Sequence, residues 1–372
     1  MTAHAESGQM TARTQRNGFL IVLALSALLM VVLQASGSSF WQSLVINLGI
    51  SIILVVSLNL SNGFTGVFSL GHIGFMALGA YVSALLTLPL RTKSLYLRDL
   101  PDWLAVVHLD ATIGQFPVGF LAATLIAGVV VSVVALLVGL VLMRLSGHFV
   151  AVATLGFLVI VRVVLVNADE FTRGSRTFSN VTQYTDLWWV FAWVVITLYI
   201  VWRLKFSAYG RAMFAQREDT AAAQSVGIVV MRPRLLAFVV SAFFTAVAGA
   251  LYAHYLTSFS PKAFYFDITF RIITMLVIGG MGSVTGSVVG PIFITAIAES
   301  LRRLEDATLL YGVSQIALAV LFIVIIIFRP GGLLGDREIN FAAIWQRLRP
   351  RGASASGGGE PPRIEQQPST RD

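Results

Sequence analysis

The 372 residues have a composition unlike that of a soluble domain, because 56% are hydrophobic and only 12% are charged. A soluble domain carries about 25% charged residues, so this chain has too little polar surface to cover its apolar content in water. The absence of cysteine excludes disulfides, thiolate metal sites and cysteine nucleophiles. The five histidines are scattered and form no metal-binding pair, so no metal site is expected.

The net charge of +8 and the isoelectric point near 10.1 would also suit a nucleic-acid partner. The basic residues, however, lie between apolar blocks rather than along one face of the chain. That distribution is typical of loops retained on the cytoplasmic side of a membrane. We therefore expect membrane lipid, and no nucleic acid, around this protein.

Apolar blocks of about 17 to 30 residues recur along the chain and are long enough to cross a hydrocarbon core of about 30 Å. They predict an all-α, polytopic transmembrane bundle of about ten membrane segments, some of them short or broken by glycine. In chain order the predicted segments are 19–33, 41–60, 68–88, 115–143, 148–166, 188–204, 235–256, 269–281, 286–300 and 311–329. The first of these also suits a signal peptide, but only a faint cleavage motif follows it, so we interpret it as a transmembrane helix.

The stretch 269–300 is split because four glycines lie between Gly279 and Gly286, each costing about 1 kcal/mol relative to alanine inside a helix. Charge supports an even number of segments. With the N-terminus inside, the loop 203–234 and the arginine-rich residues after 329 both lie in the cytoplasm, where basic loops are retained. We expect a cytoplasmic segment 1–17, a membrane domain 18–335, and a disordered cytoplasmic tail 336–372 that is rich in Gly, Ser, Pro and Gln.

No motif for bond chemistry is present, so we expect no catalytic residue. The chain has neither a GxxxxGK[ST] nucleotide-binding loop nor a GxSxG elbow, and therefore cannot hydrolyse ATP unaided. An ion-coupled secondary transporter is the alternative function, although such carriers usually keep carboxylates deep in the membrane. The ionisable candidates inside predicted segments are His72, His148, Arg162, His254, Arg271 and Glu299. Arg162 suits either an interfacial anchor or a buried partner for a polar group.

Residues 59–81 are polar and glycine-rich although they lie at membrane depth. Irregular polar backbone is tolerated there where it lines water or is packed in protein. A solute pathway and close helix packing both fit, and the pattern leaves them open. The residues that carry this candidate site are Asn59, Asn62, Ser69, Gly71, His72, Gly79 and Tyr81.

The second informative stretch lies in the basic loop 203–234. Residues 211–226 are good helix formers, and Gly227 stands where a helix C-cap is expected. A solvated connector is one interpretation. The loop is long for a connector, which favours a helix that docks on a soluble partner.

These stretches resemble the permease subunits of the branched-chain amino acid ABC transporter family, in particular the LivM type. The resemblance is carried by the order and spacing of several pieces, which together span most of the chain. They are NGFTGVFSLGHIGFMALGAY (62–81), RLSGHFVAVATLGF (144–157), GRAMFAQREDTAAAQSVGI (210–228), LLAFVVSAFFTAVAGALYAHY (235–255) and FRPGGLLG (328–335).

The resemblance implies a multi-pass permease of the bacterial inner membrane with both termini in the cytoplasm. It would import branched-chain or other small amino acids, or a related amide such as urea. Its partners would be a second homologous permease subunit, two ABC ATPase subunits that bind ATP and Mg, and a periplasmic solute-binding protein, with no cofactor in this chain. The residues implied to couple to the ATPase are Gly210, Arg211, Arg217, Glu218, Asp219, Ala222 and Gly227.

One departure concerns a predicted external loop. Related sequences often read TGGT or TGGS there, whereas this chain has Thr172-Arg173-Gly174-Ser175. An arginine adds charge to the face expected to meet the binding protein. The identity of the solute is therefore left open.

Overall fold

The computed structural model describes residues 27–28, 30–35, 37–97, 100–112, 116–145, 147–308, 312–329, 331–335 and Glu338. The chain divides into two compact units, Leu29–Glu338 and the combination of Met1–Leu28 with Ile339–Asp372. Nearly all described residues belong to Leu29–Glu338, which is the unit treated below. The predicted segment 1–17, most of 19–33 and nearly all of the tail 336–372 lie outside the described residues.

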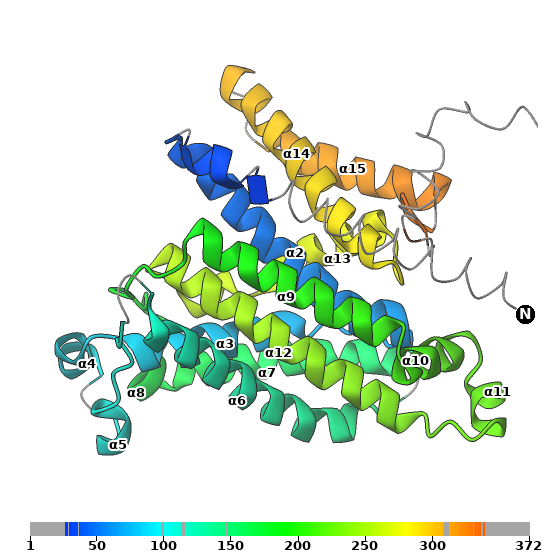
Figure 1. The fold of residues 1–372 in the computed structure, drawn as a ribbon, viewed down its shortest axis with the longest axis horizontal. Coiled ribbons are helices and arrows are strands. Elements are labelled where there is room, and N and C mark those ends of the chain that lie inside the picture. Colours follow the sequence, from blue (N-terminus) through cyan, green and yellow to red (C-terminus); the bar gives the residue numbers. More distant parts are fainter. Residues whose placement is uncertain are drawn as a thin grey trace, which may run out of the picture. The chain divides into compact units, whose positions relative to one another are not determined.

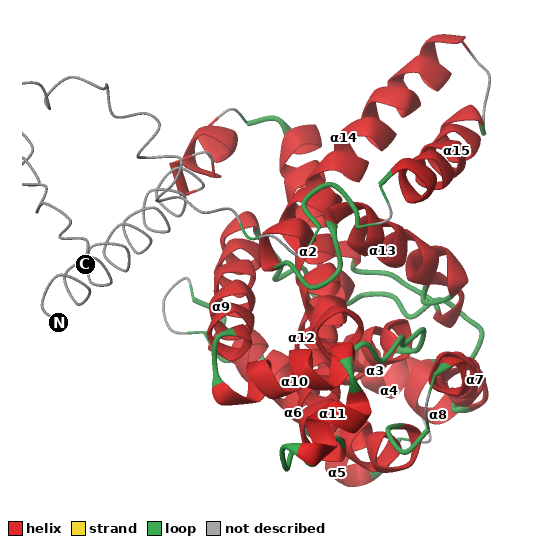
Figure 2. Cartoon of the chain, turned by 90° about the vertical axis from the view of Figure 1, so that its right-hand side faces the viewer, coloured by secondary structure: helices red, strands yellow, loops and turns green. Residues whose placement is uncertain are grey.

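The described residues form helices joined by loops, with one isolated β-bridge between Phe178 and Phe259, so the all-α prediction is confirmed for them (Figures 1 and 2). The elements are α2 (Ser39–Thr65), α3 (His72–Thr87), α4 (Leu90–Tyr96), α5 (Asp102–Ala105), α6 (Val118–Leu142), α7 (His148–Asn167), α8 (Asp169–Thr172), α9 (Leu187–Lys205), α10 (Ala208–Glu218), α11 (Thr220–Ser225), α12 (Met231–Leu256), the 3-10 turn η1 (Pro261–Ala263), α13 (Phe266–Gly279), α14 (Val284–Thr308) and α15 (Val313–Phe328).

The prediction of about ten membrane segments was wrong. Among the described residues, six helices are long and apolar enough to cross a membrane: α2, α6, α7, α9, α12 and α14. A seventh is reached only if α3 and α4, bent by 115° at their junction, count as one broken span. At 1.5 Å per residue, the 14 residues of α13 and the 16 of α15 reach only about 21 and 24 Å, short of the roughly 30 Å core.

The predicted break in 269–300 is confirmed. Helix α13 ends at Gly279, and α14 begins at Val284. Between them Gly280 and Gly282 have φ of 114° and 94°, which side chains disfavour. We call residues 280–283 the glycine turn.

Helix α12 lies at the centre of the packing and contacts α2, α3 and α6. Its approach to α3 depends on residues without bulky side chains. A Cβ on Gly79 would lie 2.3 Å from the Ala246 carbonyl oxygen, and one on Gly249 would lie 2.0 Å from that of Met76. Small residues allow membrane helices to pack this closely, so the two backbones are in direct contact.

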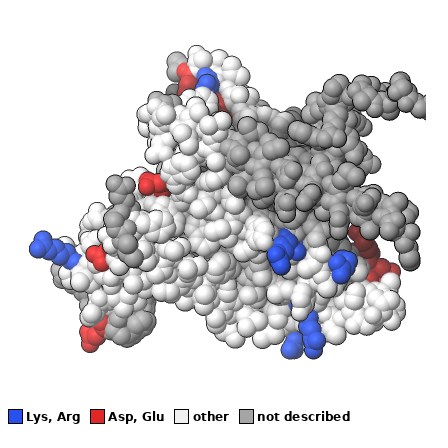
Figure 3. Space-filling view, in the orientation of Figure 1, with Lys and Arg blue, Asp and Glu red and all other residues white. Residues whose placement is uncertain are grey.

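The bundle has two distinct ends (Figure 1). Helices α10 and α11 lie at one end, called the α10 end, and α4, α5 and α8 lie at the opposite one, called the α4 end. In Figure 3, charged side chains gather near these ends and at the tip of α14, with a wide uncharged surface between them. Charge at the ends with an apolar band between them is the distribution that a bilayer requires.

Candidate functional site

The predicted docking segment is helical but is broken at Asp219, so the expectation of one helix over 211–226 was wrong there. Asp219 is extended, with φ −150° and ψ 113°. Its carboxylate accepts hydrogen bonds from the backbone amides of Ala221 at 2.8 Å and Ala222 at 3.0 Å. Aspartate favours this N-cap geometry and so starts α11 anew. Gly227 lies just beyond α11 with φ 85°, as predicted for the C-terminal end.

The start of α10 is fixed tightly to the end of α9. Ser207 caps α10 by accepting a hydrogen bond from the amide of Gly210 at 3.2 Å. A Cβ on Gly210 would lie 2.3 and 2.2 Å from the carbonyl oxygens of Leu204 and Lys205, so the turn requires glycine. Met213 is fully buried in a cluster with residues of α2, α9 and α12. Helix α10 is therefore packed directly against the membrane helices α2, α9 and α12.

Arg217 points inward and binds α2. Its Nη1 donates to the Gly63 carbonyl oxygen at 2.8 Å, near the C-terminal end of α2 where carbonyls lack helical partners. The side chain of Arg217 is 25% exposed, whereas that of its neighbour Glu218 is 75% exposed. Arg211, Ala222 and Gly227 are also exposed. The predicted coupling residues thus divide into inward anchors and an outward surface.

Asn59 binds the glycine turn. Its Nδ2 donates to the Ser283 carbonyl oxygen at 2.9 Å and to Ser287 Oγ at 2.7 Å, while its Oδ1 accepts from the Gly282 amide at 2.8 Å. The side chain is buried, with 1% exposed. Asn59 therefore joins α2 to the glycine turn and the start of α14, and all three of these hydrogen bonds link residues distant in sequence.

Asn62, Ser69 and His72 form a second buried network. Asn62 Oδ1 accepts from the Ser69 amide at 3.0 Å, and Ser69 Oγ lies 3.0 Å from His72 Nδ1. His72 Nε2 contacts Ser241 Oγ, which itself donates to the Ser57 carbonyl oxygen at 2.7 Å. Because the hydrogen of Ser241 is engaged there, Nε2 of His72 carries the ring hydrogen and Nδ1 accepts from Ser69. The network joins α2, α3 and α12.

The two predicted glycines of this region lie at helix contacts. A Cβ on Gly71 would lie 2.6 Å from the Thr154 carbonyl oxygen of α7, and Gly79 meets α12 as described above. Of the two interpretations that the sequence left open for residues 59–81, close packing with satisfied polar groups describes these six positions in this conformation. Tyr81 differs from them.

The Tyr81 ring lies among Phe178, Phe259 and Phe264, with ring centroids 5.7, 5.0 and 6.4 Å away. We call these four residues the aromatic cluster. Tyr81 is 4% exposed, and its hydroxyl has no hydrogen-bond partner among the described residues. Buried polar groups are nearly always paired, so a buried unpaired hydroxyl is unusual. The β-bridge between Phe178 and Phe259 holds two loops of the α4 end together over this ring.

Other ionisable residues of the membrane segments have local partners. The Arg162 guanidinium stacks 3.9 Å over the Tyr265 ring. This contact favours the interpretation of Arg162 as an anchor over that of a partner for a buried polar group. His254 binds the Thr182 carbonyl oxygen through Nδ1 at 2.9 Å. Glu299 pairs with Arg302 at 2.9 Å on α14. The side chain of His148 lies outside the described residues.

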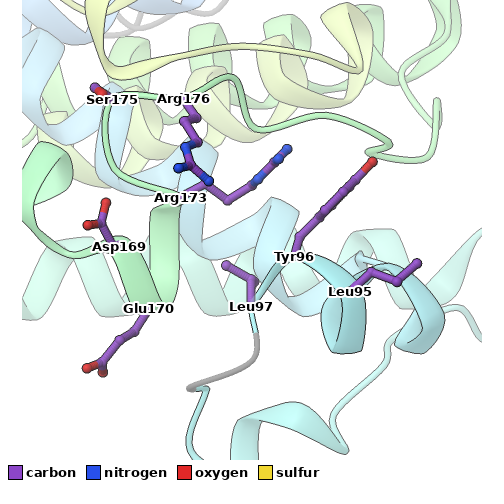
Figure 4. A pocket seen from close by; sticks show the side chains of 8 residues that line it. All are labelled: Leu95, Tyr96, Leu97, Asp169, Glu170, Arg173, Ser175 and Arg176. Carbon is purple, nitrogen blue, oxygen red and sulfur yellow. The ribbon is translucent and has the colours of Figure 1, made fainter.

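A pocket of about 550 Å³ opens at the α4 end (Figure 4). Two acidic residues, two basic residues, one serine and three hydrophobic or aromatic residues line it: Leu95, Tyr96, Leu97, Asp169, Glu170, Arg173, Ser175 and Arg176. The guanidinium of Arg173 stacks 3.9 Å over the Tyr96 ring. Arg173 also has φ 63°, a left-handed conformation that favours the glycine expected from the resemblance.

Sequence reasoning missed a third cluster, at the α10 end. Lys205 Nζ donates to Glu338 Oε1 at 2.5 Å and to the Gly282 carbonyl oxygen at 2.7 Å. Glu338 also accepts hydrogen bonds from the first amides of α14. In the sequence, Lys205 is simply one of the basic residues of the loop 203–234. Nothing near Glu338 in the sequence indicates its partners, which lie 54 and 133 residues away.

The structure is that of a polytopic helical membrane protein. It has long apolar helices, the anchored helix α10 at one end and a charged pocket at the other. Residues 40–328 match the family described as branched-chain amino acid transport system / permease component. The chain belongs to this permease family, as the resemblance predicted, and is a multi-pass membrane protein.

Individual relatives agree with this assignment. The chain is 30% identical over 319 residues to the high-affinity branched-chain amino acid transport system permease protein LivM of Escherichia coli K12, covering 77% of this chain and 68% of the relative. It is 22% identical over 322 residues to a probable LivM of Methanocaldococcus jannaschii, covering 78% and 92%. The LivH permease of Salmonella typhimurium is 30% identical over 180 residues, covering 47% and 56%. No solved structure matches the chain.

Proposed function

We propose that this chain is one of two homologous permease subunits of an ATP-binding cassette importer in the bacterial inner membrane. It carries branched-chain or other small amino acids, or a related amide such as urea. Family membership supports this proposal, and the single observation that carries it is the seating of α10. The helix is anchored inward by Arg217 and Met213 while it presents Glu218 outward.

In this proposal the α10 end and both chain termini face the cytoplasm. Two ATPase subunits, which bind ATP and Mg, dock on the outward surface of α10 and α11. When they close, α10 moves and pulls α2 through the bond from Arg217 to Gly63. Asn59, a residue of α2, passes the movement to the glycine turn, since its side chain is hydrogen-bonded to Gly282 and Ser283 there. Rigid helices moving against one another give alternating access.

The α4 end faces the periplasm and receives the solute-binding protein. The pocket offers both signs of charge, which suits complementary charged groups on a partner. The solute passes the aromatic cluster, where the hydroxyl of Tyr81, which has no partner among the described residues, supplies a hydrogen bond to it. The other predicted pathway residues hold the helices that border this route.

The test compares two arginines that differ in their anchoring. In the complete transporter, Arg217→Gln should reduce solute uptake at least tenfold while the subunit stays in the membrane and ATP hydrolysis continues. Arg232→Gln is the matched control. Arg232 is exposed, and its substitution removes the same charge near the same end of the bundle. Uptake by Arg217→Gln at the wild-type rate would remove the basis of the proposal.

A second measurement addresses the alternative function. The purified chain alone, reconstituted into vesicles with a proton or sodium gradient, should not accumulate leucine or urea. Accumulation without ATPase subunits would identify an ion-coupled secondary transporter instead.

A further inference from the structure

The chain folds back on itself after α15. The amide of Leu333 donates to the Ile278 carbonyl oxygen at 2.7 Å, and that of Leu334 to Gly279 at 3.3 Å. Gly332 has φ 78°, and a Cβ there would lie 2.5 Å from the Val277 carbonyl oxygen. Residues 331–335 therefore lie against the last turn of α13, and Glu338 follows shortly after them in the chain.

Glu338 caps α14. Its Oε1 accepts from the Val284 amide at 2.8 Å, and its Oε2 accepts from the amide and hydroxyl of Thr285 at 3.0 and 2.8 Å. A carboxylate at a helix N-terminus is favoured by the unpaired amides and the helix dipole. Burial by itself raises the pKa of Glu338, but the bonds from Lys205 and these amides outweigh it and hold the pKa below its usual range.

Lys205 completes the cluster from the other side. It is the last residue of α9, and α10 begins at Ala208. The side chains of Lys205 and Glu338 are only 11% and 16% exposed. The ion pair therefore joins the α9–α10 junction to the N-terminus of α14, and Lys205 also holds the Gly282 carbonyl oxygen directly.

A largely buried ion pair is a poor means of adding stability, because desolvation of both charges offsets their attraction. What the ion pair provides is a fixed geometry, because it holds two elements at a defined position relative to each other. The elements held here are the junction that leads into α10 and the glycine turn, which hydrogen bonds also connect by way of α2. The cluster thus forms a second connection between the same parts.

We propose that Glu338 is a positioning residue of the transport cycle: through Lys205 it locks the start of α10 to the N-terminus of α14, so that both move as one when the ATPases close. This inference rests on the proposed function and adds to it a connection that does not pass through Arg217. Without the ion pair, α10 moves but α14 lags behind it, and ATP is hydrolysed without solute being carried.

The test measures solute uptake and ATP hydrolysis in the same vesicles, with the complete transporter. Glu338→Gln should raise the number of ATP molecules hydrolysed per solute at least fivefold. Glu360→Gln, the same change elsewhere in the C-terminal sequence, should leave the ratio unchanged. Glu338→Asp keeps the charge with a shorter side chain and should give an intermediate ratio.

Lys205→Met separates positioning from simple capping. It leaves Glu338 free to cap α14 but breaks the ion pair, so it should raise the ratio as Glu338→Gln does, and the double variant should be no worse than either single one. A wild-type ratio in Lys205→Met would overturn the proposal. So would an equal fall of uptake and hydrolysis in Glu338→Gln and Glu338→Asp, because that result indicates a folding defect.

The outcome also separates this inference from the proposed function. If Arg217→Gln loses uptake while Glu338→Gln keeps the wild-type ratio, α10 couples through α2 alone and only the Glu338 connection fails. If Arg217→Gln itself transports normally, the coupling role of α10 fails.

Discussion

The α10 end and the pocket of the α4 end use charge in opposite ways. At the α10 end, Arg217, Lys205 and Glu338 are largely covered, and each binds backbone groups of another helix. At the α4 end, acidic and basic side chains line an open pocket, while four aromatic rings close the space beneath the loops.

This difference indicates what each end can do. Covered charges bonded to helix termini hold elements in fixed relation, so a force on one reaches the others. Exposed charges contribute little to stability but steer and select a partner. In the proposed function, the α10 end therefore transmits movement and the α4 end recognises a partner.

The largest effect on stability is expected at the contact between α3 and α12, which supports both ends of the bundle. Gly249→Ala should destabilise the protein by about 2–3 kcal/mol, because the new methyl group would lie 2.0 Å from the Met76 carbonyl oxygen. Gly156→Ala is the matched control, since a Cβ there meets nothing within 4 Å.

Thermal unfolding of the two purified variants makes the check. Gly156→Ala should gain up to about 1 kcal/mol from its higher helix propensity. Similar stability in both variants would mean that α3 and α12 do not pack through their backbones.

Part of this arrangement follows from local sequence. The glycines between 279 and 286 predict the break before α14, and Gly227 predicts the end of α11, because each acts through its own backbone. Lengths were harder to predict. Apolar composition extends the segment 311–329 to a spanning length, whereas the helix there is 16 residues long.

The contacts of the site could not be predicted, for a different reason. Asn59 and Ser283 are 224 residues apart, and either would fit equally well in a water-lined pathway or a packed contact. From the sequence, Asp219 is one more charged residue of a helix. In the structure its carboxylate caps the following helix, α11. Such roles depend on which backbone groups tertiary packing leaves unpaired.

A smaller effect is expected at the pocket of the α4 end. Arg173→Gly relieves a left-handed backbone, worth about 1 kcal/mol, but loses the stacking on Tyr96 and the guanidinium's hydrogen bonds to Thr177 and Ser179, which together offset that gain. Stability should change little, while the concentration of binding protein that gives half-maximal uptake should rise about three- to tenfold.

Arg173→Lys sharpens that measurement because it keeps the charge and loses the planar stacking group. If charge selects the partner, Arg173→Lys should stay within about twofold of the wild type at low salt, with the difference between the two variants shrinking as salt screens the interaction. Equal losses in both variants would assign the effect to the stacking of Arg173 on Tyr96. The arginine of the α4 end would then act, like Arg217 at the α10 end, by holding its neighbours in place rather than by its charge.

Tyr81→Phe is the smallest structural change. It tests whether the aromatic cluster only closes the α4 end or also binds the solute. A buried hydroxyl without a partner costs free energy, so its removal should leave the protein as stable as before or more stable by about 1 kcal/mol. If the hydroxyl binds the solute, the same variant should need about two- to fivefold more solute-loaded binding protein for half-maximal uptake. Greater stability together with unchanged uptake would mean that Tyr81 serves only to close the α4 end, and the solute's route would have to be sought elsewhere among the helices.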